Sequence, residues 1–327
     1  MDNRLTKKRL SDFLAYEWIL TIIVAVAAIF VWELVYTVAA TRLSTGQQFK
    51  FYFDETVYMS DSSDKSVYDL LGVNLGENGK TFSFDVLSVE TENLTASYNV
   101  LSVRLSVQEG DAIFTSSVAE EGQDIRAKQI IDSASVYDLD ALINGENGAK
   151  AYLAKFVISG GDIYNETDYD EDEIKAYFDA RMAGDKRFRT DAEKEEGRKN
   201  EIGRIKKLAK DVKDFETLLS VGEEKGLFYR YTKYEQSASA ENADENVVKA
   251  HEKEIEKGKA DRIYGLNMAA LTGGNKNVSD YLKLSGKGNS EGVVLMLFDF
   301  SEYQPDLQFE GISFTMTLVR EFSDILG

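Results

Sequence analysis

The sequence predicts an α/β protein: a single amino-terminal transmembrane helix followed by an extracytoplasmic α/β domain with a charged helical middle section. Three observations support this fold class. Residues 18–40 form an apolar run that carries one charge, Glu33. After this run, strand-like and helix-like patterns alternate, which is typical of a sheet with crossover helices. Residues 161–260 then become dense in charge with a helical period.

Charge and composition narrow the function classes. The chain has 327 residues and a net charge of −19, and after Arg42 it holds 33 basic and 53 acidic residues. Nucleic acid is not an expected partner, because a domain this acidic repels phosphate backbones. There is no cysteine, which excludes disulfides, thiolate metal sites and a lipid-modified cysteine anchor. The single histidine, His251, lies in a charged stretch and is expected on a solvated helix face.

Residues 18–41 are predicted to be a membrane anchor. At about 1.5 Å per residue, a helix of this length spans a hydrocarbon core of roughly 30 Å. Trp18, Trp32 and Tyr36 lie where an interfacial aromatic belt would be. Glu33 follows Trp32 directly, so we expect it at the outer interface. A span shifted outward would instead make Glu33 a buried acid with a functional role.

The charges around the span predict its orientation. A basic cluster from Arg4 to Arg9 precedes the span, and acidic sequence follows it. By the positive-inside rule, residues 1–17 are a cytoplasmic tail and the large carboxyl-terminal part is extracytoplasmic at the cell membrane. The alternative is a cleavable signal peptide, with Val38 and Ala40 before a cut at Thr41. The length of the apolar run and the charge of Glu33 favour the uncut signal anchor.

Residues 42–160 are expected to form the first α/β part. "TGQQFKFYFDETVYM" predicts a linker that leads into a strand, "SDSSDKSVYDLLGVNL" a short helix, and "KTFSFDVLSVET" a second strand. Helical spacing runs from Leu94 to Gln108 and stops at Gly110. "DAIFTSS" then predicts a buried strand, and "VYDLDALING" a short helix.

Residues 161–260 form the predicted charged helical section. One apolar stripe follows a helical period and is expected to pack on a core: Ile202, Ile205, Leu208, Ala209, Val212 and Phe215. "LFYRYTKYEQ" predicts a strand and "SASAENADEN" a loop.

Residues 261–327 are expected to complete the α/β domain. "ADRIYGLNMAALTGGNKNVSDYLKLSG" predicts a helical or mixed segment, a Gly-Gly turn and a short helix. "EGVVLMLFDF" predicts a fully buried strand. "GISFTMTLVREFSDIL" predicts an amphipathic helix.

No motif assigns a catalytic residue, a cofactor site or a metal site, and the ligand-binding residues stay unknown at this stage. The acidic run Asp162 to Glu173 departs from the calcium-binding EF-hand pattern, because Tyr164 or Glu173 falls at a required position. Charge at a helix amino end explains this run equally well, and calcium binding there stays open. The pairs Gly160-Gly161 and Gly273-Gly274 belong to no phosphate-binding motif.

One stretch resembles the extracytoplasmic solute-binding proteins of carbohydrate ABC transporters. "YNVLSVRLSVQEGDAIFTSS" followed by "SVYDLDALI" is similar to their run of helix, glycine-aspartate turn, buried strand and short helix, with Gly110-Asp111 and Asp138-Leu139-Asp140 in corresponding places. The match covers about 50 residues, and Ala112-Ile113-Phe114 replaces the family's "PDV". The ending of the chain resembles single-span surface proteins of Firmicutes, a Gram-positive group. The resemblance implies a shortened, membrane-anchored solute-binding-like protein.

Three function hypotheses follow. The first is a solute-binding-like or accessory protein of a carbohydrate ABC transporter, with the lipid bilayer, a transporter and a carbohydrate as partners. The second is a structural or assembly protein that binds a protein partner and no small molecule. An exposed apolar stripe along 200–219 would favour it. The third is a surface hydrolase with two carboxyl groups roughly 5–10 Å apart. We expect a non-enzymatic function of the first or second kind.

Overall fold

The computed structural model describes residues 7–13, 18–39, 48–60, 88–94, 98–119, 125–232, 244–256, 262–300 and 309–327. The chain divides into two compact units, Met1–Arg42 and Leu43–Gly327. The short helix expected after Ser60 lies outside the described residues, as does the beginning of the strand expected at 80–91.

The amino-terminal unit contains α1 (Lys7–Asp12) and α2 (Trp18–Ala39). A helix of the 22 residues in α2 is about 33 Å long, which is enough to cross a bilayer. Trp18–Tyr36 has the length and apolar composition of a membrane span, and a signal sequence near an amino terminus has them too. The side chains of Trp18, Trp32, Glu33 and Tyr36 are all exposed on α2.

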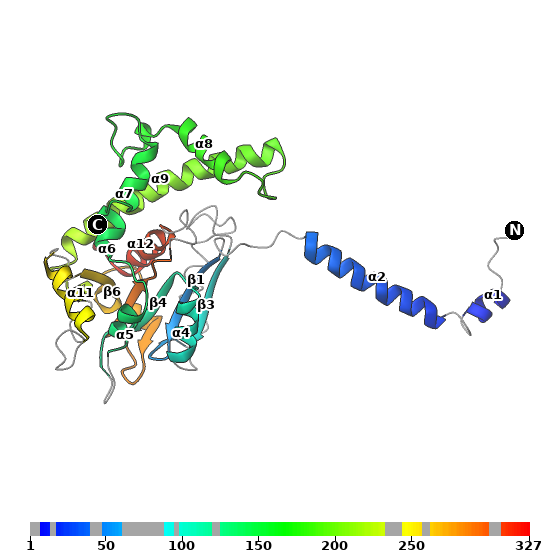
Figure 1. The fold of residues 1–327 in the computed structure, drawn as a ribbon, viewed down its shortest axis with the longest axis horizontal. Coiled ribbons are helices and arrows are strands. Elements are labelled where there is room, and N and C mark those ends of the chain that lie inside the picture. Colours follow the sequence, from blue (N-terminus) through cyan, green and yellow to red (C-terminus); the bar gives the residue numbers. More distant parts are fainter. Residues whose placement is uncertain are drawn as a thin grey trace. The chain divides into compact units, whose positions relative to one another are not determined.

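The second unit is built on a mixed sheet of six strands in the order β3-β1-β4-β8-β6-β5 (Figure 1). Strands β3, β1 and β4 are parallel, and β8 runs antiparallel to both β4 and β6. Strand β5 is antiparallel to β6, and a two-stranded antiparallel sheet joins β2 to β7. The strands are β1 (Gln48–Asp54), β2 (Val57–Met59), β3 (Ser88–Leu94), β4 (Ala112–Ser116), β5 (Phe228–Tyr231), β6 (Arg262–Asn267), β7 (Leu282–Leu284) and β8 (Val293–Leu297).

Both faces of the central sheet are buried, because successive side chains of a strand point to opposite faces. In β1, Phe51 and Phe53 belong to the larger apolar core, whereas Tyr52 belongs to a smaller core on the other side. The predicted strands within residues 48–59, 111–117, 227–236 and 291–300 are all present. The run in β8 is continuous because it is a central strand with both faces covered.

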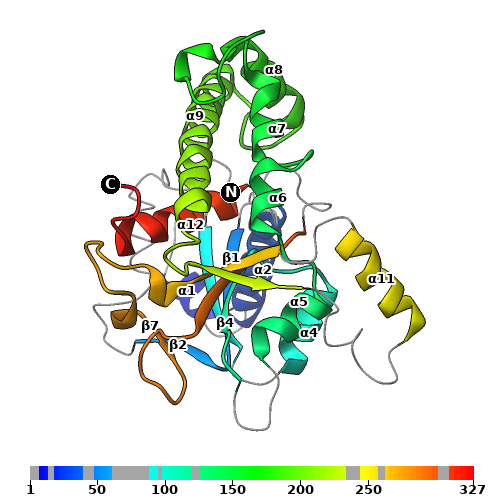
Figure 2. The same ribbon diagram turned by 90° about the vertical axis from the view of Figure 1, so that its left-hand side faces the viewer.

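Helices cover the two faces of the sheet (Figures 1 and 2). Side chains of α4 (Tyr98–Ser106) and α5 (Arg126–Ser133) belong to the smaller core. The larger core includes side chains of α6 (Leu139–Asn144), α7 (Ala149–Leu153), α9 (Asp191–Val221) and α12 (Glu310–Phe322). The remaining elements are α8 (Glu171–Arg181), α11 (Glu245–Glu256) and the 3-10 turns η3 (Ala154–Phe156), η4 (Glu166–Asp168), η5 (Met268–Ala270) and η6 (Val278–Asp280).

The helical middle section is present, and its apolar stripe packs on the core as predicted. Helix α9 has 31 residues and begins with a capping box in which Thr190 and Glu193 satisfy each other's backbone amides. Five of the six stripe residues are buried, and Ile202 is half-buried. The condition that would favour an assembly function, an exposed stripe, is therefore not met. Beyond the sheet, α8 and the first turns of α9 extend together (Figure 2).

Two predictions need correction and a third needs refinement. Residues 262–267 form strand β6, not a helix, because Ile263, Tyr264 and Leu266 are all buried between β5 and β8. Helix α4 begins at Tyr98 and not at Leu94, because β3 pairs with β1 through Leu94. Helix α12 is amphipathic in sequence, but it has no solvent-facing side, since 11 of its 13 residues are buried.

Candidate functional site

The carboxyl ends of β1, β4 and β6 meet at one edge of the sheet. Strand β1 has β3 on one side and β4 on the other. The connection from β3 to β4 therefore crosses from one side of β1 to the other. This arrangement is a topological switch point, and open α/β sheets bind their ligands outside the carboxyl ends of the strands at such points. The edge is therefore the first place to examine for a ligand site.

A buried carboxylate ends β1 at this edge. Asp54 is 3% exposed, and it accepts hydrogen bonds from the Thr56 amide (2.6 Å), from the Thr56 hydroxyl (2.5 Å) and from the Thr115 hydroxyl. Arg126, at the start of α5, pairs with Glu55 and has its Nε 4.0 Å from Asp54. Because these donors already occupy Asp54, the cluster fixes the ends of β1 and β4.

The small β2-β7 sheet connects the switch point with the loop that follows β6. The Ser285 amide donates to the Thr56 carbonyl (2.8 Å), and the Ser60 amide donates to the Tyr281 carbonyl (2.9 Å). The segment 271–281 thus lies beside β2 and leads directly into β7.

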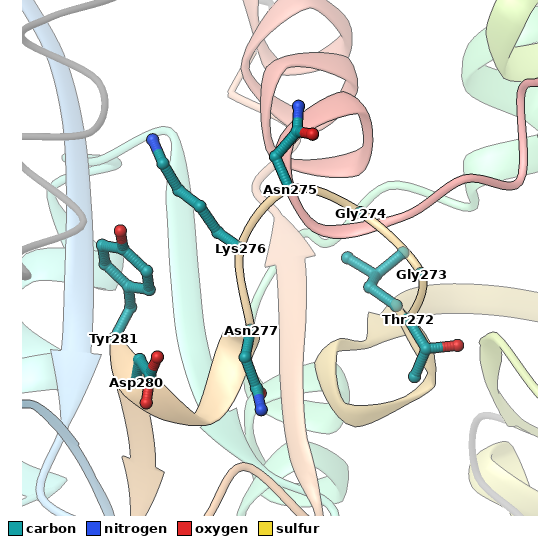
Figure 3. Close-up of a pocket in the computed structure, with 9 residues that line it drawn as sticks. Thr272, Gly273, Gly274, Asn275, Lys276, Asn277, Asp280 and Tyr281 are labelled. Carbon is teal, nitrogen blue, oxygen red and sulfur yellow. The ribbon is translucent and has the colours of Figure 1, made fainter.

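This segment forms a pocket of about 570 Å³ (Figure 3). The volume is within the range of small-molecule sites, roughly 300–1,000 Å³. Its lining comes from one short stretch of chain, residues 271–277 together with Asp280 and Tyr281. We call it the polar loop pocket.

Backbone bonds to the end of α12 hold the polar loop pocket in shape. The amides of Gly274 and Lys276 donate to the carbonyls of Phe322 (3.3 Å) and Glu321 (3.2 Å). Gly273 has φ +85°, and a Cβ at Gly274 would lie 2.3 Å from the Phe322 carbonyl carbon. Glycine is therefore required at both positions for this close approach.

The side chains of the pocket supply polar groups of several kinds. Lys276 Nζ lies 3.2 Å from Glu321, and the side chain of Asn277 accepts from the Ser279 amide (3.0 Å). Asn275 is exposed, and the Tyr281 ring packs edge-on against Phe322 with centroids 5.4 Å apart. In Figure 3, Lys276 and Tyr281 point to the same side of the loop.

Such a set can both donate and accept hydrogen bonds. Asparagine carries two amide donors and a carbonyl acceptor, lysine only donates, and the tyrosine hydroxyl does both. A ligand rich in hydroxyl groups needs this mixture, because every hydroxyl is at once a donor and an acceptor. The pocket therefore suits a small polar, hydroxylated molecule.

The sequence did not single out this pocket as a binding site. The pair Gly273-Gly274 predicts a turn and belongs to no phosphate-binding motif. The available signal was the polar run Asn275-Lys276-Asn277 directly after the two glycines, since a glycine turn followed by amide side chains is typical of an exposed polar loop. Its position beside α12 depends on tertiary packing.

The other predicted candidates are not among the residues that line this pocket. Trp18, Trp32, Glu33 and Tyr36 belong to α2, in the amino-terminal unit. His251 lies in α11. Within the part of the chain that the structure describes, no group of three or more His, Asp or Glu side chains could hold a metal ion.

The acidic run Asp162 to Glu173 serves local backbone capping. The Asp170 side chain accepts from the amides of Asp172 (3.0 Å) and Glu173 (3.2 Å) and caps α8, as the helix-end explanation predicts. The Asp168 carboxylate accepts from the Asp162 amide (2.9 Å) and the Asn165 side chain (2.9 Å).

The stretch that resembles solute-binding proteins has the local structure expected of it. Helix α4, a turn at Gly110, strand β4, helix α5 and short helix α6 follow in that order, so an additional helix separates β4 from α6. Asp111 binds the Lys50 amide (2.7 Å), and burial raises the pKa of its carboxyl group to about 7. Asp138 caps α6, and burial also raises its pKa.

No family model, curated protein or solved structure matches the chain.

Proposed function

We propose that the protein is a membrane-anchored, extracytoplasmic binding protein for a small hydroxylated solute, with carbohydrates as the first class of ligand. The observation that carries this proposal is the polar loop pocket, whose segment is bonded to the end of α12 and to Ser60 after β2. The α2 helix supports the anchor, since it is long and apolar enough to cross a membrane. The basic cluster before α2 supports an outside position for the domain.

We further propose that the protein serves a carbohydrate ABC transporter. This part rests on the resemblance of residues 98–143 to the solute-binding proteins of such transporters. Elements α4, β4 and α6 are compatible with that resemblance, and α5 is an additional helix between β4 and α6. A binding role also fits the pocket better than hydrolysis does, because the described residues that line it include a single carboxylate, Asp280, and a glycosidase needs two.

A thermal-shift screen of the full chain in detergent against mono- and oligosaccharides tests the proposal, with and without calcium. A ligand at 100 times its Kd stabilises the folded state by about 2.7 kcal/mol and raises the melting temperature. Asn275→Ala and Lys276→Ala should abolish or weaken the shift for the sugar that binds.

Asn200→Ala is the matched control, because Asn200 is exposed on α9 and does not line the pocket. A shift that all three variants retain would place the ligand elsewhere. No shift with any sugar, on a protein that melts cooperatively, would contradict the carbohydrate proposal.

A further inference from the structure

Helix α8 and the amino end of α9 extend beyond the sheet (Figure 2). Residues of this part of the chain line a second pocket. Its volume is about 570 Å³, and its lining comes from residues 178–198. We call it the arm-tip pocket. It belongs neither to the switch point nor to the polar loop pocket.

The floor of the arm-tip pocket is aromatic. Phe178 and Phe188 pack edge-to-face with ring centroids 5.0 Å apart, and they are 1% and 9% exposed. Gly197 of α9 makes room for both rings, since a Cβ there would lie 2.3 Å from Phe178 and 2.9 Å from Phe188. Met182 also lines the pocket. The floor can therefore accept an apolar group.

The rim carries an excess of positive charge. Four basic residues line the pocket against two acidic ones, Asp179 and Asp185, in a chain whose net charge is −19. The two carboxylates are already engaged: Arg198 binds Asp179 (2.7 Å), and Arg187 binds Asp185 (2.9 Å). The pocket therefore has few free acceptors and a surplus of donors.

The other three basic residues that line the pocket are not paired with these two carboxylates. Within the described residues, no carboxylate lies within 4.0 Å of the charged groups of Lys186, Arg189 or Lys194, and the Glu193 carboxylate accepts a hydrogen bond from the Arg189 backbone amide (2.9 Å). Lys186 and Arg189 are exposed and Lys194 is half-buried. Ammonium and guanidinium groups bind phosphate and carboxylate through charge-assisted hydrogen bonds, which are stronger than neutral ones.

We propose that the arm-tip pocket binds a small organic anion, a phosphate monoester or carboxylate that carries an apolar group. The anionic group binds Lys186, Arg189 and Lys194 at the rim, and the apolar group lies against Met182 and Phe188. The domain as a whole repels anions, so binding depends on this local cluster and weakens as salt screens it.

Isothermal titration of the full chain in detergent with phenyl phosphate tests this inference, with inorganic phosphate and benzoate as comparison probes. Phenyl phosphate should bind at low salt and at least ~10-fold more tightly than inorganic phosphate, because only it offers a ring to the floor. The double variant Lys186→Ala/Arg189→Ala should weaken its binding at least ~10-fold.

Lys199→Ala and Lys213→Ala together are the matched control, because they remove two charges from exposed positions on α9 outside the pocket. Asn275→Ala should not affect this binding, which separates it from the polar loop pocket. The inference is wrong if phenyl phosphate does not bind at millimolar concentration, or if the control weakens binding as much as the pocket variant does. Equal affinities for phenyl phosphate and inorganic phosphate would show that the aromatic floor does not contribute to binding.

Discussion

Glu201 offers a direct test of how the helical section is joined to the α/β core. It is 0% exposed and binds Arg204 (2.7 Å) and Arg181 (3.0 Å). Arg204 also donates to the Tyr152 hydroxyl (2.7 Å) and has Nη1 3.8 Å from Glu310 of α12. Two positive and two negative groups thus share one buried cluster that connects α7, α8, α9 and α12.

Glu201→Gln should leave one uncompensated positive charge in this cluster. Breaking a buried ion pair by removing one partner typically destabilises a protein by about 3–5 kcal/mol. For a domain of this size, that corresponds to a drop in melting temperature of roughly 6–20 °C. Urea unfolding followed by circular dichroism gives the free energy of unfolding, and calorimetry gives the melting temperature.

The control is Glu195→Gln on the same helix. Glu195 pairs with Arg198 (3.2 Å) but its side chain is 71% exposed, so its removal should leave stability nearly unchanged. The double variant Glu201→Gln/Arg204→Gln should recover part of the loss, because it removes both charges. A Glu201→Gln loss below about 1 kcal/mol would refute the buried-charge argument.

The same cluster should make the stability of the protein depend on pH in the acid range. Burial acts to raise the pKa of Glu201, but the charges of Arg204 and Arg181 outweigh it and hold the pKa below its usual 4.5. The stabilisation is therefore complete above about pH 4.5 and is lost as the pH falls further. Glu201→Gln should flatten the acid limb of the stability profile, whereas an unchanged limb would contradict this assignment.

Three further predictions concern the sheet and helix α9, which packs on it. Burial raises the pKa of the Asp111 carboxyl group to about 7, so the folded state is favoured while this group is protonated and loses stability as the group ionises. Asp111→Asn should therefore flatten the fall in the free energy of unfolding between about pH 4 and pH 7, by at most ~1.4 kcal/mol per pH unit. Urea unfolding at several pH values measures this change. Gly110→Ala should cost about 1–3 kcal/mol or more by the same assay, since Gly110 has φ +106° and a Cβ would lie 2.3 Å from the Tyr52 ring. Phe215→Ala should cost about 3–5 kcal/mol in thermal unfolding, because Phe215 is 0% exposed in the larger core.

Each of these predictions has an outcome that contradicts it. An Asp111→Asn profile parallel to that of the parent protein would show that Asp111 does not titrate in this window. A Gly110→Ala protein of unchanged stability would mean that the turn relaxes without strain. A small effect of Phe215→Ala would show that the stripe of α9 does not pack on the core.

Much of the fold could be predicted from local patterns in the sequence. The alternation in "FKFYFD" predicts strand β1, and the continuous apolar run "VVLML" predicts strand β8. The stripe from Ile205 to Phe215 repeats every three or four residues and correctly predicted a packed helix face. These signals are local because one buried face sets the period of its own element.

The errors arise where the environment is not local. In β6, Ile263, Tyr264, Gly265 and Leu266 are all buried, so no alternation marks the strand, and its apolar run resembles a helix. Helix α12 is buried on nearly every side between the sheet and α9, so its polar Ser313 points to Asp211 (2.6 Å) and not to solvent.

The polar loop pocket could not be predicted for a related reason. Its lining is contiguous in sequence, but the loop becomes concave only because Gly274 and Lys276 bond to the end of α12, nearly 50 residues further along the chain. The arm-tip pocket likewise depends on Gly197 of α9 meeting Phe178 of α8. Neither contact produces a periodic pattern in the sequence from which it could be predicted.

The central claim is that the polar loop pocket binds a hydroxylated solute. The most direct measurement is isothermal titration of the full chain in detergent with the carbohydrate that gives the largest thermal shift, compared with Asn275→Ala and Asn200→Ala. We expect binding that Asn275→Ala weakens at least ~10-fold and Asn200→Ala leaves intact. Equal affinity for the parent protein and Asn275→Ala, or no binding of any carbohydrate, would contradict it.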